Sequence, residues 1–247
     1  MNFVSFEKLL RIDIQMSKQE FLNTLEQFVI IGPGSLSIAL TTAFFVGLVF
    51  SLQVIKEFLY LDAASLIGAV LTLAFIRELS PVLTSVIVIG RVCSSFTAEL
   101  ATMAVTDQLD TLYLLQASPF FYLVVPRVIA CLIVLPALNV LCLITSLASS
   151  SFMCFILYNI DPAIFFASAF SALYFLDIIK SIVKTIIFAV IMSAMSCFLG
   201  LTATGGAKGV GRSTTLSVVA CLLAIFLADF ILSYFMFNRL GSSIQVL

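Results

Sequence analysis

Histidine is absent from this chain, and only 10% of its 247 residues are charged. The lack of histidine excludes histidine-based acid–base catalysis, Ser-His-Asp and Cys-His nucleophiles, and most zinc and haem sites. Cysteine occurs six times but never as a Cys-x-x-Cys pair, and the cysteines are scattered through apolar sequence. We interpret them as buried small hydrophobic residues, so we expect no catalytic residue, no metal and no cofactor.

Long apolar runs dominate what is present. Hydrophobic residues make up 62% of the chain, and the mean hydropathy of +1.22 lies outside the range of soluble domains. The net charge of −1 gives no reason to expect nucleic acid as a partner. Because the apolar runs are continuous and do not alternate, they predict helices and not barrel strands. The sequence therefore predicts an all-α, polytopic membrane helix bundle with about five transmembrane helices.

The apolar runs can be placed along the chain, since about 20 residues suffice to cross a bilayer. The expected spans cover roughly residues 35–55, 63–92, 128–160 and 214–237, and another begins among Asp177, Lys180 and Lys184 and continues to about Gly200. Residues 163–175 are too short to cross, so we expect a surface or re-entrant helix there.

The N-terminal segment has no continuous apolar core, which is not typical of a cleaved signal peptide. Ser17 and Glu20 have the spacing of a capping box, and apolar residues after them follow one stripe of a helix. We predict an interfacial helix that ends at Gly32-Pro33-Gly34, with a frayed tail as the alternative. The chain is accordingly divided into an N-terminal interfacial segment, residues 1–33, and a membrane domain, residues 34–240.

Charged residues interrupt the second span. Arg77 and Glu78 lie within apolar sequence, just before the helix-kinking Pro81, and a charge at the bilayer centre costs about 2.5–3.5 kcal/mol on insertion scales. The charges at bilayer depth sum to zero: Arg77, Lys180 and Lys184 against Glu78, Asp177 and Asp229. We predict that Glu78 or Arg77 faces Lys184 and Asp229 around a hydrated cavity. The alternative is that these pairs only set the helix register.

An amphipathic segment follows the second span. Residues 99–116 mix acidic and apolar side chains, which predicts a helix lying at the membrane surface with one face in water. Lys and Arg gather in the loops on one side of the five spans, which predicts that this side is cytoplasmic. That side holds Lys8, Arg11, Lys18, Arg91, Arg127, Lys208 and Arg212, and the other holds only Lys56 and Arg239.

A glycine-rich segment, residues 204–212, separates the last two spans. Residues 206–213 match the phosphate-loop pattern G-x-x-x-x-G-K-[ST] except that Arg212 replaces the lysine. A phosphate loop follows a buried strand and opens a helix, whereas a membrane helix precedes this segment. We therefore interpret it as a flexible cytoplasmic turn that can belong to a docking surface.

Four motifs in this order resemble one protein family. They are RELSPVLTSVIVIGR from Arg77, AELATMAVTDQLDTL from Ala98, SPFFYLVVPRVIA from Ser118 and GLTATGGAKGVGRSTTLSVVA from Gly200. The chain is similar over about residues 28–238 to the MlaE-type permeases, including those of algal plastid genomes and the chloroplast envelope. These permeases are the membrane subunits of ABC transporters that work with MCE-domain lipid-binding proteins.

The resemblance implies a homodimeric permease that moves phospholipid or a related polar lipid between its membrane and an MCE-domain partner. A separate ABC ATPase subunit would supply the energy. The resemblance further implies a substrate cavity lined by Arg77, Glu78, Lys184 and Asp229. The family's cytoplasmic coupling helix maps onto residues 99–112, with Glu99, Thr106, Asp107, Gln108 and Asp110 at matching positions. Ser80 and Ala101 stand where relatives usually have glycine.

Two other functions remain open from the residues alone. A multi-pass lipid-modifying enzyme would need clustered carboxylates, and an ion-coupled carrier would show inverted repeats. The host membrane implied by the resemblance is the plastid (chloroplast) inner envelope or a bacterial inner membrane.

Overall fold

The described part of the chain is helical throughout. The structure is a computed structural model, and it describes residues 18–61, 63–114 and 118–237, in which no strand occurs. Five helices are long and apolar enough to cross a membrane, at Leu22–Tyr60, Ile67–Val105, Phe120–Tyr158, Phe175–Leu201 and Gly206–Met236. This confirms the predicted all-α polytopic bundle.

The first helix, α2 (Lys18–Tyr60), is continuous over 43 residues and contains Pro33. The predicted helix end at Gly32-Pro33-Gly34 is therefore wrong, and no separate interfacial helix precedes the first span within the described residues. The predicted cap at Ser17 and Glu20 falls on residues and side chains outside the described part. Proline removes one helical hydrogen bond, but neighbouring polar groups make it tolerable in membrane helices. Here the guanidinium of Arg91 packs against Gly34, where a side chain would collide with it.

The second long helix is built from several segments. After a short 3-10 turn, η1 (Ala64–Leu66), come α3 (Ile67–Ala74), a π-helical segment η2 (Phe75–Leu79), α4 (Ser80–Val88), a second π-helical segment η3 (Ile89–Cys93) and α5 (Ser94–Val105).

The prediction of a single amphipathic helix over residues 99–116 is wrong, because the first part of this range belongs to α5 and the separate helix α6 (Gln108–Leu114) follows. The break lies at Asp107, whose φ of 57° is left-handed.

The remaining helices follow the predicted order. The π-helical η4 (Phe120–Val124) leads into α7 (Val125–Tyr158), which contains Pro136 as expected. Asp161 caps the short α8 (Pro162–Ala172) by accepting a hydrogen bond from the Ala163 N–H. α9 (Phe175–Leu201) begins with Asp177 in its first turn, and α10 (Gly206–Phe237) completes the bundle.

The glycine-rich segment is mostly not a loop. Residues 206–212 form the first two turns of α10, so the predicted flexible turn is reduced to residues 202–205. Gly205 and Gly206 have φ values of +95° and +68°, which few other residues adopt readily. The glycines therefore serve the sharp connection between two packed helices.

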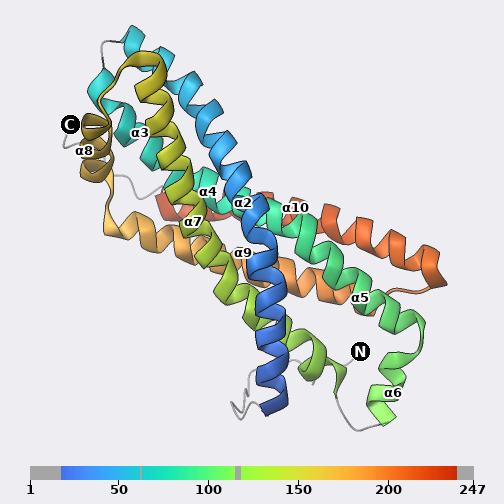
Figure 1. The fold of residues 1–247 in the computed structure, drawn as a ribbon. Coiled ribbons are helices and arrows are strands. Elements are labelled where there is room, and N and C mark those ends of the chain that lie inside the picture. Colours follow the sequence, from blue (N-terminus) through green and yellow to red (C-terminus); the bar gives the residue numbers. More distant parts are fainter. Residues whose placement is uncertain (1–17, 62, 115–117, 238–247) are drawn as a thin grey trace.

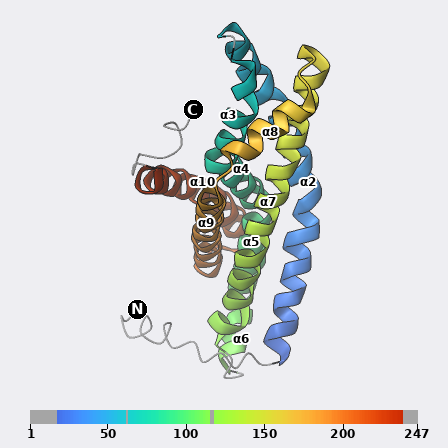
Figure 2. The same ribbon diagram turned by 90° about the vertical axis from the view of Figure 1, so that its left-hand side faces the viewer.

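The helices pack as two groups (Figure 1). α2 lies along α7, and α5, α9 and α10 pack on one another; Figure 2 shows α2 and α7 running side by side. α4 contacts both α7 and α9 and so joins the two groups. Seven helices or helix segments contribute to the largest buried apolar cluster, whose members include Ile31, Val88, Leu135, Phe188 and Ile225.

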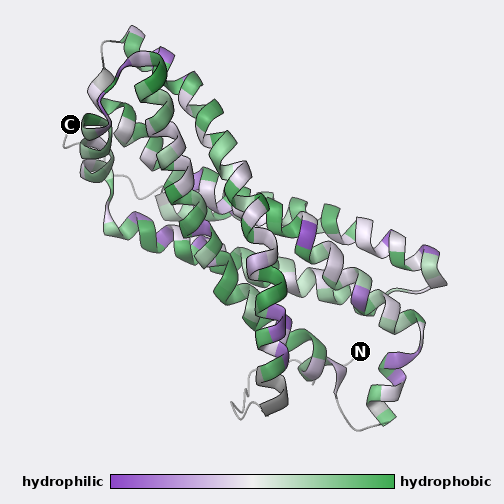
Figure 3. Cartoon of the chain, in the orientation of Figure 1, coloured by the Kyte–Doolittle hydropathy of each residue, from purple (hydrophilic) through white to green (hydrophobic). Residues whose placement is uncertain are grey.

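The two ends of the bundle differ. α6 lies at the opposite end of the molecule from α3 and α8 (Figure 1). The long helices are mostly hydrophobic along their length, and hydrophilic residues occur at α6, in the first part of α2 and at a few positions inside the bundle (Figure 3). α6, which carries Asp110, therefore lies at one end of the bundle, where its polar side chains would be in contact with water.

Candidate functional site

The charged pair of the second span lies in a π-helical turn. Arg77 and Glu78 belong to η2, and Pro81 follows in the first turn of α4. Proline has no N–H to donate to the carbonyl of the residue four positions earlier, which here is Arg77. Lys184 Nζ donates to that carbonyl oxygen over 3.0 Å. The backbone irregularity thus creates an acceptor for a cation from another helix.

Lys184 is the centre of an ion cluster that joins three helices. Its Nζ lies 2.8 Å from Glu78 Oε2 and 2.6 Å from Asp229 Oδ1. It also donates to Ser233 Oγ over 2.8 Å, and the Ser233 hydroxyl lies 2.9 Å from Glu78 Oε1. The Lys184 side chain is 1% exposed. Burial of this ammonium is tolerable because two carboxylates, a hydroxyl and a carbonyl oxygen lie within 3.0 Å of it.

Arg77 points elsewhere. Its Nη2 lies 3.1 Å from Asp177 Oδ2 at the start of α9, and Lys180 Nζ lies 4.0 Å from the other oxygen of the same carboxylate. Successive residues on a helix diverge by about 100°, so Arg77 and Glu78 engage α9 at different positions. The structure therefore brings Glu78, Lys184 and Asp229 together, while the Arg77 side chain joins a neighbouring pair.

One side of the ion cluster is open to the surface of the chain. The side chain of Glu78 is 44% exposed and that of Asp229 is 19% exposed, in contrast to Lys184. A carboxylate exposed on a membrane-spanning helix is costly in contact with acyl chains. The surface around Glu78 is accordingly suited to contact with water, a lipid headgroup or another protein chain.

A buried polar bridge supports the cluster from behind. The Ser80 hydroxyl lies 2.7 Å from Asn139 Oδ1, and Asn139 Nδ2 donates to Ser181 Oγ over 3.0 Å. All three residues are less than 5% exposed. Ser80 follows η2 directly, and Ser181 lies between Asp177 and Lys184 on α9. Asn139 of α7 therefore connects the two segments that carry the charges.

Sequence reasoning did not select Asn139, Ser181 or Ser233, and it noted Ser80 only as a position where relatives usually have glycine. A signal was present for Asn139, the only amide in the interior of the charge-free run of residues 128–160, whose other amide, Asn159, lies at its end. The bonding of the serines could not be predicted, because serine is common in membrane helices and often bonds to its own helix backbone.

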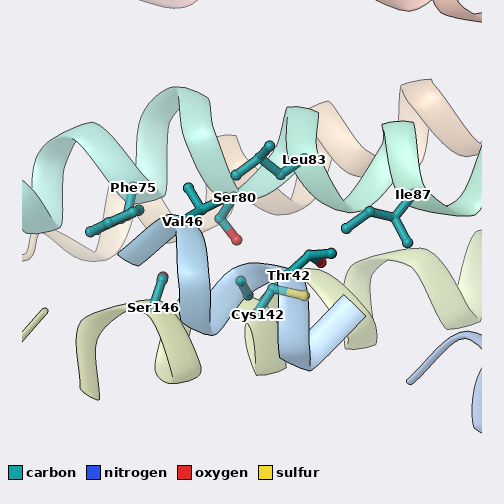
Figure 4. Close-up of a pocket in the computed structure, with 9 residues that line it drawn as sticks. Thr42, Val46, Phe75, Ser80, Leu83, Ile87, Cys142 and Ser146 are labelled. Carbon is teal, nitrogen blue, oxygen red and sulfur yellow. The ribbon is translucent and has the colours of Figure 1, made fainter. Parts of the chain in front are cut away.

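A small enclosed cavity lies beside this bridge, between α2, η2, α4 and α7 (Figure 4). Its volume is about 20 Å³, enough for about one water molecule. Its lining consists of Thr42, Ala43, Val46, Phe75, Ser80, Leu83, Ile87, Cys142 and Ser146. None of the four charged residues predicted to line a substrate cavity borders this one.

The predicted coupling residues fall into two sets. Thr106, Asp107, Gln108 and Asp110 are exposed at the break between α5 and α6. Glu99 lies earlier, on α5, and its Oε2 is 2.7 Å from Nη2 of Arg127 in the first turn of α7. Within the described residues, no group of three or more Cys, Asp or Glu side chains is arranged to hold a metal ion.

Comparison with known proteins places the chain in a family. The family model described as Permease MlaE matches residues 24–235. A probable ABC transporter permease protein, ycf63, from Pyropia yezoensis is 53% identical over 95% of this chain and 89% of its own length. A probable ABC transporter permease protein from Synechocystis is 50% identical over 90% of this chain and 84% of its own.

A chloroplast protein of Arabidopsis thaliana, named TRIGALACTOSYLDIACYLGLYCEROL 1, is 47% identical over 94% of this chain and 66% of its own length. The matched region includes every long apolar helix almost completely. The chain therefore belongs to the MlaE permease family, as a multi-pass protein of a plastid or bacterial membrane.

Proposed function

We propose that this chain is the permease subunit of an ABC transporter that moves phospholipid or a related polar lipid. In this proposal two copies form the membrane part, a separate ATPase subunit drives it, and an MCE-domain protein exchanges lipid with it. Membership of the MlaE family supports the proposal, as do the relatives named ABC transporter permeases. The name of the Arabidopsis relative refers to a galactolipid, which is a polar lipid.

The observation that carries the proposal is the half-exposed Glu78 carboxylate beside the fully buried Lys184 ammonium. An arrangement that only set the helix register would be better buried on both sides, because exposure to acyl chains is costly for a carboxylate. A hydrated space next to Glu78 would remove this cost, because the carboxylate would then contact water and not acyl chains. Such a space, with ions at its rim and apolar walls, has the two properties needed to hold a lipid headgroup and its tails.

The surface of α10 supports a second copy as the other wall of that space. Only 17% of the α10 span is buried within the chain, the smallest share among the five spans. Asp229 lies on this helix, and Phe226, Phe230 and Tyr234 stand on its exposed side at 52%, 72% and 58% exposure. A partner chain against this helix would enclose the carboxylates without exposing them to lipid.

The energy for transport would come from outside the chain. The glycine-rich segment follows the helix α9 and not a strand, so it lacks the context of a phosphate loop. The exposed turn of Thr106, Asp107, Gln108 and Asp110 projects at one end of the bundle and is suited to docking an ATPase. Closure of the ATPase would displace this turn, and the second long helix runs from it to the ion cluster.

The test is reconstitution in vesicles with the candidate ATPase and MCE-domain protein. We expect ATP-dependent transfer of a labelled phospholipid or galactolipid, its loss in Lys184→Ala, and near-normal transfer in Lys180→Ala, a matched lysine one turn away on α9. Association with the ATPase, measured per molecule of tagged chain that accumulates in the membrane, should survive Lys184→Ala. If no ATPase associates and no lipid moves with ATP, the proposal is wrong; chemical conversion of the lipid would indicate an enzyme, and transfer driven by an ion gradient a carrier.

A further inference from the structure

Arg127 makes a buried set of contacts at the start of α7. Its residue exposure is 5%, and its Nη2 lies 2.7 Å from Glu99 Oε2. Its Nη1 donates to the carbonyl oxygen of Phe96 over 3.3 Å, and its Cζ lies 5.1 Å from the centroid of the Phe96 ring. One guanidinium thus holds the side chain, the backbone and the aromatic ring of α5 at once, which its planar fork of donors permits.

Glu99 is engaged on both of its carboxylate oxygens within the chain. Oε2 binds Arg127, and Oε1 accepts a hydrogen bond from Ser95 Oγ over 3.1 Å. The other predicted coupling residues differ, because Asp107 and Asp110 are exposed at the turn beyond α5. The geometry therefore distinguishes Glu99, whose side chain is 46% exposed but is paired within the chain, from the exposed acids at the turn.

The Glu99–Arg127 pair closes the neck of the projecting segment. Residues 100–126 leave α5, pass through α6 and return through η4 to α7. The pair ties the two helices together where this excursion starts and ends. Further along the same two long helices, Ser80 and Asn139 form a second tie beside the ion cluster. Two contacts at separate points along the same pair of helices restrict sliding and rotation of one helix relative to the other.

We propose that Glu99 and Arg127 act as a clasp, a positioning pair that makes α5 and α7 move as one body when the α6 turn is displaced. This inference rests on the proposed function and reassigns Glu99 from ATPase docking to force transmission inside the chain. Without the clasp, displacement of α6 would be absorbed by separation of α5 from α7. ATP would still be hydrolysed, but less of the movement would reach the ion cluster.

The experiment uses the reconstituted complex with its ATPase and measures ATP hydrolysis and lipid transfer in the same vesicles. We expect Arg127→Met to lower lipid transferred per ATP by about tenfold, within the range in which single residues alter coupling, while hydrolysis continues. Glu99→Gln should lower the same ratio, and the double variant should be no worse than Arg127→Met alone. Arg127→Lys should recover part of the ratio, since it restores the charge but not the fork of donors.

The control is Asp110→Asn, an exposed carboxylate beyond the clasp. It should alter how much ATPase associates and leave the ratio of transfer to hydrolysis unchanged in the complexes that form.

If Arg127→Met does not accumulate in the membrane, Glu99→Gln alone decides, because Glu99 is partly exposed and glutamine keeps its shape. An unchanged ratio, or additive effects of the two substitutions, would overturn the clasp while wild-type transport still supports the proposed function. Absence of coupled transport in the wild type would overturn both.

Discussion

Ser80 donates a hydrogen bond to Asn139 at bilayer depth, 2.7 Å from hydroxyl oxygen to amide oxygen. The bond links the residue that follows the π-helical turn to the middle of α7. Through its other amide atom, Asn139 also holds Ser181, one turn from Lys184. A single amide therefore orients both halves of the ion cluster without touching a charge.

Removing this amide should loosen the bundle measurably. Asn139→Ala is expected to lower stability by about 1 kcal/mol, the order measured for hydrogen bonds between membrane helices, and hence the unfolding midpoint by roughly 2–4 °C for a chain of this size. The measurement is thermal unfolding in detergent. Ser80→Ala should cost less in the Asn139→Ala background than in the wild type, because the bond to the amide oxygen is already gone and only the bond to the backbone carbonyl of residue 139 is left to remove. Full additivity would contradict the bridge.

Removing the central cation should be more damaging. Lys184→Met leaves Glu78 and Asp229 without their counter-ion, and breaking a buried pair on one side costs about 3–5 kcal/mol. We expect poor accumulation in the membrane, measured by immunoblotting of membrane fractions and by thermal unfolding.

Neutralising the whole cluster separates stability from transport. The triple variant Glu78→Gln, Lys184→Met and Asp229→Asn leaves no unpaired ion, so accumulation in the membrane should recover. Lipid transfer should not recover, because the ionic rim of the proposed cavity is gone. Normal transfer by the triple variant would mean that these charges only set the helix register.

Association of the ATPase with the turn between α5 and α6 should depend on the charge of the side chains at this turn. Reversing both acids, Asp107→Lys with Asp110→Lys, is expected to reduce association with the ATPase, measured by co-purification. The matched comparison is Asp107→Asn with Asp110→Asn, which removes the charges but keeps the shape, with a residue that tolerates the left-handed φ of 57° at position 107. Neutralisation should reduce association less than charge reversal does. If neutralisation and reversal reduce association equally, the sign of the charge does not govern docking at this turn.

Close packing of α2 on α7 depends on Gly47. A Cβ there would collide with the Ser149 hydroxyl and the Ser146 carbonyl. Gly47→Ala should therefore destabilise the chain by roughly 1–3 kcal/mol through overpacking. Gly211 on α10 is the control, since a Cβ there meets nothing within 4 Å. Gly211→Ala should be neutral or stabilising by up to about 1 kcal/mol, because alanine favours helix. Unfolding midpoints of the two variants give the comparison.

The errors made from the sequence have a common physical cause. Gly32-Pro33-Gly34 and residues 206–212 carry strong helix-breaking residues, yet both lie within helices. Local propensity is a weak guide when neighbouring helices supply the missing contacts, as Arg91 does beside Gly34. The opposite error arose at residues 99–116, where a single helix was predicted and the periodicity gave no sign of the left-handed Asp107.

Composition and hydropathy were sufficient to determine the class of the protein, its long apolar helices and the presence of costly charges that require partners, because these follow from transfer free energies of individual side chains. Partner choice was decided by the tertiary structure alone. Pro81 and the π-helical turn aim the Arg77 carbonyl and Glu78 at Lys184, while the Arg77 side chain turns to Asp177. Arg127 at the start of α7 pairs with Glu99 on α5. Such pairings depend on helix rotation and register, which arise from packing along the whole bundle and leave no local pattern in the chain.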